Sequence, residues 1–211
     1  MASTSNMMMS ALRASLVTWL LCGLIYPLML TGLGQWIFPF QANGSLEKSP
    51  DGIVVGSRLL GQQWNGPEWF HGRPSATMGT DPSDPTKTIA VPYNAASSGG
   101  SNLGPTSKTL MERIAKDRRD IERAQPELVG RPLPSDMLTT SASGLDPDIS
   151  PANADLQVER VAQARGVSPA DIRLLLDSSI TSRSLGIFGE PRVNVLLLNL
   201  ALQRAYSKPG R

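Results

Sequence analysis

Residues 16–38 read LVTWLLCGLIYPLMLTGLGQWIF, an apolar stretch of 23 residues, and no charged residue occurs between Arg13 and Glu47. As an α-helix with a rise of about 1.5 Å per residue, this stretch is roughly 34 Å long, slightly more than the ~30 Å hydrocarbon core of a bilayer. The sequence therefore predicts one membrane-spanning helix, within an anchor that we place at residues 14–40.

A cleaved secretory signal is the alternative, because Arg13 places a positive charge directly before the apolar run. A signal usually has a shorter apolar region, and no small-x-small cleavage pattern follows this one. Trp36, Phe38 and Phe40 instead form an aromatic border of the kind that lies at a membrane interface. We therefore favour an uncleaved anchor.

Two features inside the run affect its packing. Pro27 removes one backbone donor, so a kink or a contact with another helix is expected there. Gly23, Gly32 and Gly34 leave small surfaces that allow a neighbouring helix to approach closely, which predicts a partner in the membrane. A lipid-facing anchor with incidental glycines is the alternative.

The charges are unevenly distributed along the chain. Of 20 Lys and Arg residues only Arg13 precedes the apolar run, and all 18 acidic residues follow it, so the remainder carries 19 minus 18, or +1. This balance argues against nucleic-acid binding, which needs a basic face. A positive flank without acids predicts that residues 1–13 are a cytoplasmic tail and that residues 41–211 form an extracytoplasmic domain.

Residues 41–211 are sufficient for one domain with its own core. Residues 44–105 contain 17 Gly and Pro in 62 positions, which predicts short strands, turns and ordered loops. The apolar runs at 53–55 and 58–60 predict two short strands. Three aromatic residues follow, and we expect them to cover a small core rather than form a recognition surface: Trp64, Trp69 and Phe70.

Helices are predicted after residue 105. Residues 107–124 have many charges and a narrow apolar stripe, which is typical of a solvated helix. Ser150-Pro151 and Ser168-Pro169 each combine an N-cap with a proline at the first helical position, so a helix should begin at each. The remaining expectations are a helix end at Gly166, a buried helix at 193–206, a strand at 137–141, and frayed ends at 1–11 and 208–211.

The predicted fold class is therefore α+β. One N-terminal transmembrane helix precedes a single soluble domain, whose first half is rich in strands and whose second half is helical.

The sequence contains no phosphate-binding loop, nucleophile elbow or cluster with metal-ligand spacing. His71, the only histidine, has no positional support as a catalytic base, and we expect a capping role. We predict no catalytic and no metal site. Two loops rich in Ser, Gly and Asn, at 93–105 and 141–151, are the exceptions, since Gly99 and Gly100 allow a backbone nest that would hold an anion.

Together these segments resemble one family, the C subunit of the Kdp-type potassium-transporting P-type ATPase of bacteria and archaea. The resemblance extends over nearly the whole chain, in family order. After the anchor, the matching segments are GSRLLGQ at 56–62, FHGRPSA at 70–76, YNAASSGGSNLGPTS at 93–107, SGLDPDISP at 143–151 and GEPRVNVLLLNLAL at 189–202.

The resemblance implies an accessory, non-catalytic subunit of an ATP-driven high-affinity potassium uptake pump, which supports assembly and stability of the complex. Its partners would be a channel-like potassium-binding subunit, an ATP-hydrolysing P-type subunit and a small stabilising subunit. It would be a single-pass protein of the bacterial inner membrane, with its soluble domain near the external potassium entrance. The chain lacks the Asp-Lys-Thr-Gly-Thr phosphorylation motif, which agrees with a non-catalytic role.

The family is also described as a catalytic chaperone that raises the ATP affinity of the hydrolysing subunit through a ternary complex. ATP is then the one cofactor to consider, and a nucleotide-binding regulator is the second hypothesis, with Arg73, Ser98, Gly99, Gly100 and Ser101 as contacts. The predicted topology opposes it, because ATP is cytoplasmic. A membrane-tethered hydrolase is a remote third alternative, because no base is positioned beside its serines.

The motif match marks a small set of structural or interface candidates. Asp148 stands where the family pattern often carries His or Asn, so we assign no role to its side chain. The candidates are Arg73, Asn94, Ser98, Gly100, Asn102 and Asn194.

Overall fold

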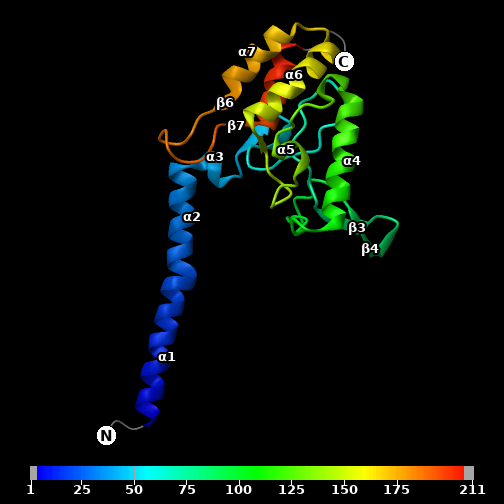
Figure 1. The fold of residues 1–211 in the computed structure, drawn as a ribbon. Helices are drawn as coiled ribbons and strands as arrows, with labels where there is room; N and C mark the ends of the chain where they lie inside the picture. Colours follow the sequence, from blue (N-terminus) through cyan, green and yellow to red (C-terminus); the bar gives the residue numbers. More distant parts are fainter. Residues whose placement is uncertain (1–3, 50, 207–211) are drawn as a thin grey trace. The chain divides into compact units, whose positions relative to one another are not determined.

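The structure is a computed structural model that describes residues 4–49 and 51–206, and the chain divides into two compact units, Met1–Leu46 and Glu47–Arg211. The first unit is a long helix made of α1 (Thr4–Leu20), a π-helical segment η1 (Leu21–Ile25) and α2 (Tyr26–Ile37), followed by the short α3 (Pro39–Ala42) (Figure 1). Within the described chain, Thr4–Ile37 is the one helix that is long and apolar enough to cross a membrane.

The helix begins earlier than the sequence indicated. Residues 4–11 are helical, so the expectation that 1–11 is frayed is wrong over this range; Ala, Leu and Met are good helix formers and extend the helix. Before Pro27 the hydrogen bonding changes, and the Tyr26 N–H donates to the Leu21 carbonyl, five residues back. Because Pro27 has no N–H to offer Gly23, a local π turn at this point has a clear cause.

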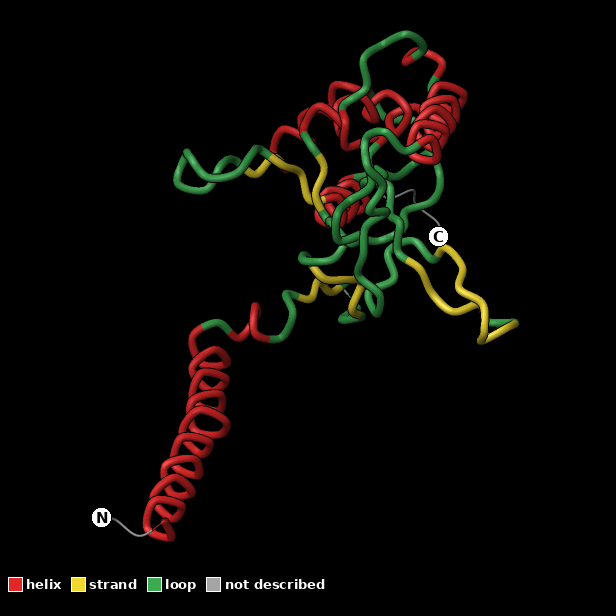
Figure 2. The backbone as a smooth tube through the Cα atoms, turned by 60° about the horizontal axis from the view of Figure 1, so that its bottom comes forward, coloured by secondary structure: helices red, strands yellow, loops and turns green. Residues whose placement is uncertain are grey.

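The described residues form three small sheets. In the first, β1 (Leu46–Lys48) pairs with β2 (Val54–Ser57), and in the second β3 (Met78–Asp81) pairs antiparallel with β4 (Asp84–Ala90). The third has the order β5-β7-β6, with β7 (Arg192–Asn194) in the centre and β5 (Asp148–Ile149) and β6 (Ile180–Thr181) on either side. The β3–β4 hairpin and the loop between β6 and β7 project from the helical body (Figure 2).

Two strand predictions are wrong. Residues 58–60 form a turn, because β2 ends at Ser57 and the Leu60 N–H donates to the Ser57 carbonyl. Residues 137–141 overlap α5 (Ser135–Leu138) instead of forming a strand. In α5, the Asp136 carboxylate accepts hydrogen bonds from the Ser150 backbone N–H at 2.7 Å and from the Ser150 hydroxyl at 3.0 Å.

The remaining helices are α4 (Lys108–Ala124), the 3-10 helix η2 (Pro126–Leu128), α6 (Pro151–Arg165), α7 (Pro169–Ser179) and α8 (Val195–Ala205). The two N-caps predicted from the sequence, Ser150 and Ser168, are confirmed, because each side chain accepts a hydrogen bond from a backbone N–H in the first turn. Ser107 caps α4 in the same way. Gly166 ends α6 with φ +69°, a left-handed conformation that glycine adopts without strain.

The core lies among α6, α7, α8 and the three-stranded sheet. Phe70 joins it from the irregular first half and is fully buried, while Trp64 packs at its edge, so the expectation that these aromatics cover a core is confirmed for both. The ring centroids of Trp69 and Trp64 lie 5.0 Å apart. The Arg165 guanidinium lies 4.5 Å from the centroid of the Trp69 ring. The other core residues are Ile149, Ala154, Val158, Val161, Ala162, Ile172, Leu176, Val193, Val195, Leu198 and Leu202.

Two buried amide side chains hold the backbone around Phe70. Asn199 of α8 accepts from the Phe70 N–H and donates to the Phe70 carbonyl, both at 2.9 Å. Gln157 of α6 does the same for His71, at 2.8 Å and 3.1 Å. These contacts replace the ladder of a neighbouring strand, since buried backbone groups need partners. They join the irregular half of the domain to its helical half.

Candidate functional site

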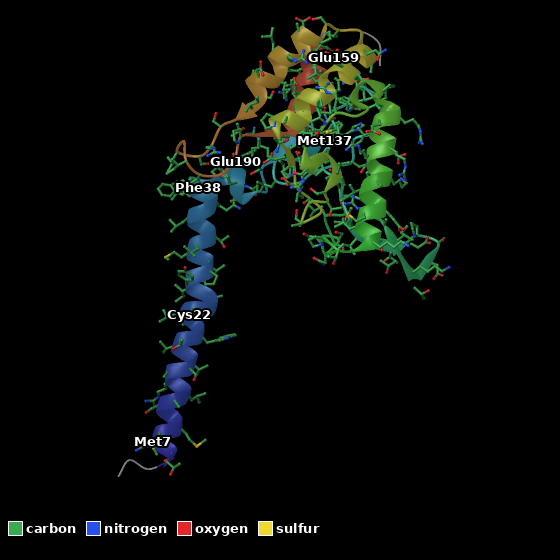
Figure 3. The ribbon with its side chains drawn as sticks, viewed as in Figure 1. Met7, Cys22, Phe38, Met137, Glu159 and Glu190 are labelled. Carbon is green, nitrogen blue, oxygen red and sulfur yellow. The ribbon has the colours of Figure 1, made fainter. Side chains whose placement is uncertain are left out.

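A cavity of about 710 Å³ lies between the irregular segment at 62–76, α4 and α6. The irregular segment contributes Arg73 together with His71, and Tyr93 lies beside them from the loop that follows β4. The helices contribute the apolar Met137 of α5 and polar side chains of α4 and α6, including Arg113, Asp117, Asn153, Gln157 and Arg160. Figure 3 shows Met137 within this part of the domain.

Charges in the cavity wall are largely balanced by neighbouring groups. Arg73 pairs with Asp146 at 3.0 Å, and Arg113 pairs with Asp117 at 2.6 Å one helical turn along α4. Arg160 instead donates to neutral acceptors, among them the carbonyl of Pro67 at 2.7 Å. Burial lowers the pKa of Arg160 to about 10, so this side chain stays charged at neutral pH.

His71 serves as a structural cap. Its Nε2 donates to the Gly66 carbonyl at 2.9 Å, because a carbonyl oxygen can only accept. Burial lowers the pKa of His71, and the charge of Arg160 lowers it further, so the ring is neutral at pH 7. The expected capping role is thus supported by its hydrogen bond.

Tyr93 closes one side of the cavity by binding backbone. Its hydroxyl donates to the Arg73 carbonyl at 2.6 Å, and burial with the nearby Asp146 charge raises the pKa of Tyr93 to about 12. A Cβ on Gly61 would clash with the Tyr93 ring, and a Cβ on Gly72 would clash with the Tyr93 hydroxyl. Tyr93 is therefore a neutral donor that holds the 61–73 segment in place.

Of the five residues expected to contact ATP, two line the cavity and three contact the second polar loop. Arg73 and Ser101 line the cavity, and Ser101 accepts a hydrogen bond from the Thr140 hydroxyl at 3.3 Å. Ser98 and Gly99 bind the second polar loop: the Ser98 hydroxyl and the Gly99 N–H both donate to the Ser143 carbonyl, at 3.0 Å and 2.8 Å.

Gly100 packs against the same second loop. A Cβ at this position would lie 2.8 Å from the Ala142 carbonyl oxygen, so a larger residue does not fit without a shift. The two polar loops therefore satisfy each other. The anion nest expected at Gly99 and Gly100 has at least one of its donors engaged within the protein.

The other candidates act in local structure. The Asn94 amide donates to the Met78 carbonyl at 2.7 Å, and Asn102 adopts φ +51°, a conformation that asparagine tolerates. Asn194 caps α8 by accepting from the Leu197 N–H at 3.1 Å, and it donates to Asp148 at 3.2 Å. Asp148 also pairs with Arg192 at 3.1 Å.

Burial raises the pKa of Asp148, and its pairing with Arg192 works in the opposite direction. The carboxylate thus has a structural partner on β7, the central strand of the three-stranded sheet. This contact accommodates the acid at position 148.

Polar residues of α4 and α6 in the cavity wall were not anticipated from the sequence. Asn153, Gln157 and Arg160 follow one another at helical spacing, directly beside the apolar face of α6. This polar stripe could have indicated the cavity wall from the sequence, because polar side chains next to the buried face of a helix usually have hydrogen-bond partners in the protein. The charges of α4 were interpreted only as a solvated face.

Comparison with known proteins identifies the family. The sequence matches the family described as KdpC, K+-transporting ATPase, c chain, over residues 8–204. The chain belongs to this family. The match includes the apolar helix and nearly all of the soluble unit, so the resemblance found in the sequence motifs is confirmed.

Curated relatives agree with this assignment. The chain is similar to potassium-transporting ATPase KdpC subunits from Bradyrhizobium diazoefficiens (53% identical over 193 residues, 92% of this chain and 94% of the relative) and Rhodopseudomonas palustris (53% over 195 residues, 92% and 95%). It is also similar to the KdpC subunit of Methylobacterium nodulans, 53% identical over 205 residues that cover 95% of this chain and 100% of the relative. The chain is thus a subunit of a potassium-transporting ATPase.

Proposed function

We propose that this chain is an accessory, non-catalytic subunit that supports assembly and stability of an ATP-driven high-affinity potassium uptake pump. The observation that carries the proposal is the family match over residues 8–204, which joins one apolar helix, Thr4–Ile37, to a compact soluble domain. The helix serves as a single-pass anchor in the bacterial inner membrane. The soluble domain lies outside, near the external potassium entrance.

The partners in this proposal are a channel-like potassium-binding subunit, an ATP-hydrolysing P-type subunit and a small stabilising subunit. Two facts support a non-catalytic role. The sequence lacks the Asp-Lys-Thr-Gly-Thr motif on which a P-type ATPase forms its aspartyl-phosphate. In addition, His71 holds the Gly66 carbonyl, and Arg73 holds Asp146.

The alternative, a chaperone that binds ATP together with the hydrolysing subunit, stays a prediction. The contacts in the Ser/Gly loops do not favour it, since the Ser98 hydroxyl and the Gly99 N–H donate to Ser143 and Arg73 is paired with a carboxylate. An ATP phosphate would have to replace these partners.

The deciding experiment is deletion of this chain from a strain that expresses the other subunits with an affinity tag. We expect the tagged complex to fall apart on purification, and ATP-driven potassium uptake to be lost in reconstituted vesicles. Supplying the full chain on a plasmid should restore both. Normal uptake by a complex purified without the chain would overturn the proposal.

A further inference from the structure

The loop between β6 and β7, residues 182–191, is an exposed apolar projection that we call the tip loop. All residues from 181 to 191 are exposed, and three large apolar side chains stand at its end: Leu185 is 88% exposed, Ile187 69% and Phe188 61%. Figure 3 shows Glu190 at the base of this loop. Such a cluster on one projecting element is unlike single apolar residues scattered over a surface, which need no explanation.

The tip loop holds a defined shape although it has little contact with the body. Ser184 and Phe188 exchange two backbone hydrogen bonds, at 2.8 Å and 2.9 Å, which close a three-residue turn. An ion pair between Arg183 and Glu190, 2.5 Å long, joins the two arms. The backbone that carries the three apolar side chains is therefore closed into one turn.

Leu185 has a second unfavourable property besides its exposure. Its φ is +54°, in the left-handed region that residues with a Cβ rarely adopt, and the next residue, Gly186, has φ +77°. Asparagine or glycine would occupy this position with less strain. A strained and exposed leucine makes sense where the side chain itself is needed for contact.

We propose that the tip loop docks its Leu185, Ile187 and Phe188 side chains into an apolar pocket on a membrane-embedded partner subunit of the same ATPase. This inference rests on the proposed function, because it requires the complex. It adds the surface by which the soluble domain makes contact and the chemistry of the site that receives it.

Two observations favour this partner. First, only nine residues separate the end of α2 at Ile37 from Glu47, where the second unit begins, so the anchor keeps the domain near the membrane. Second, the chain belongs to a family of ATPase subunits, so protein partners are present there. A rigid cluster of aliphatic and aromatic side chains that fills a pocket is typical of the energetic centre of a protein interface.

A lipid surface fits the tip loop less well. Segments that bind membrane surfaces combine apolar residues such as Trp, Phe and Leu with Lys and Arg that face the headgroups. The tip has apolar residues of this kind, but Arg183 is paired with Glu190, and Arg192 at the loop's end is paired with Asp148. The membrane is therefore an outcome to be tested rather than the expected occupant.

Photo-crosslinking of the assembled pump tests the proposal. A benzophenone analogue of phenylalanine placed at position 188 of the full chain, in native membranes that contain all subunits, should give an adduct with another subunit on irradiation. Mass spectrometry identifies the adduct. Cross-linking to phospholipid alone, to a second copy of this chain, or to no subunit would overturn the proposal.

Substitutions provide the second arm of the test. Replacing all three apolar tip residues by serine should lower retention of this chain in the tagged complex about tenfold or more, as expected for loss of an interface centre. The matched control is Leu174→Ser on α7, which removes an equally exposed apolar side chain (69%) and should leave retention unchanged. Equal retention of wild type and triple variant would overturn docking by the tip loop.

Leu185→Gly separates docking from folding. Glycine accepts the left-handed conformation, so the melting temperature of the free chain in detergent should stay the same or rise, whereas retention in the complex should fall. Failure of the wild-type chain to co-purify would instead contradict the proposed function. The two failures are therefore distinguishable.

Discussion

Asn199 and Gln157 show how single side chains replace a missing strand. The segment at Phe70 and His71 is buried, yet it runs beside no β-strand with which to exchange hydrogen bonds. Each amide side chain offers one donor and one acceptor in the spacing that a backbone peptide needs. The backbone of Phe70 is therefore hydrogen-bonded by a side chain 129 positions away in the sequence, and that of His71 by a side chain 86 positions away.

Replacement of Asn199 by leucine, which has a similar volume, should destabilise the protein by about 3 kcal/mol, because it leaves the Phe70 N–H and carbonyl buried without partners. Urea unfolding of the full chain in detergent measures the change in the free energy of unfolding. Arg204→Leu, on an exposed position of the same helix, is the control and should have little effect. A loss below about 1 kcal/mol for Asn199→Leu would mean that the two groups find other partners.

Gly144 and Gly166 share a backbone conformation, with φ +70° and +69°, but differ in how closely other atoms surround them. A Cβ on Gly144 would clash with Thr77 Cγ2 and lie 2.6 Å from the Gly99 carbonyl oxygen, whereas one on Gly166 would meet no atom within 4 Å. Gly166→Ala should therefore cost only the backbone strain, about 1–2 kcal/mol, and Gly144→Ala should cost more. Thermal melts of both variants give the comparison, and equal losses would refute the close packing of the polar loops.

His71 should make stability depend on pH. Burial, together with the charge of Arg160, lowers its pKa in the folded state below the ordinary value of 6.5. Below pH 6.5 the unfolded chain therefore binds a proton that the folded chain does not, so the free energy of unfolding decreases as pH falls through this value. The difference in unfolding free energy between wild type and His71→Gln should shrink or reverse from pH 7.5 to pH 5.5. A difference independent of pH would contradict the lowered pKa.

At the scale of elements, α4 stands apart from the other long helices of the soluble unit. None of its residues 108–124, all of which are described, is buried, whereas α6 has six buried residues, four of them in the core. Polar contacts tie α4 to the domain: Arg113 donates to the Leu138 carbonyl at 3.0 Å, and Arg118 donates to the Arg131 carbonyl at 3.1 Å. Because α4 forms one wall of the cavity, these contacts hold that wall against the rest of the domain.

Hydrogen exchange should resolve this difference between the helices. Amides of α4 are expected to exchange faster than those of α6, because few buried contacts oppose local opening of α4. Arg113→Gln should accelerate exchange in α4 further without affecting α6. The control is Arg123→Gln, since that side chain is on the same helix and 78% exposed. Uniform exchange in α4 and α6 would show that α4 opens only with the whole domain.

At the scale of the whole molecule, orientation in the membrane determines which compartment the soluble domain faces. Cys22, the only cysteine, lies in the π-helical part of the anchor (Figure 3), so Cys22→Ser gives a cysteine-free background. In that background, a cysteine at exposed Ser178 should react with an impermeant maleimide in intact cells, whereas one at Ser5 should react only after permeabilisation. The reverse pattern would overturn the external location and favour access to ATP.

Elements whose signals are local were predictable from the sequence. Ser150 and Ser168 indicated where their helices begin because an N-cap acts within three residues, and the apolar run indicated the long helix because its length matches a bilayer. The β3–β4 hairpin was not anticipated, because Pro82 and Pro85 in its sequence favour a turn reading, although Pro85 is tolerated on an exposed strand.

The sequence by itself determined the family, the apolar helix, the helix starts and the mixed fold class, since all of these depend on patterns along the chain. Only the tertiary structure decided that Arg73 meets Asp146, that Asn199 holds Phe70, and that the Ser/Gly loops bind each other instead of presenting free donors. The reason is physical: such contacts join residues 45 to 129 positions apart, and no local preference of either partner specifies the other.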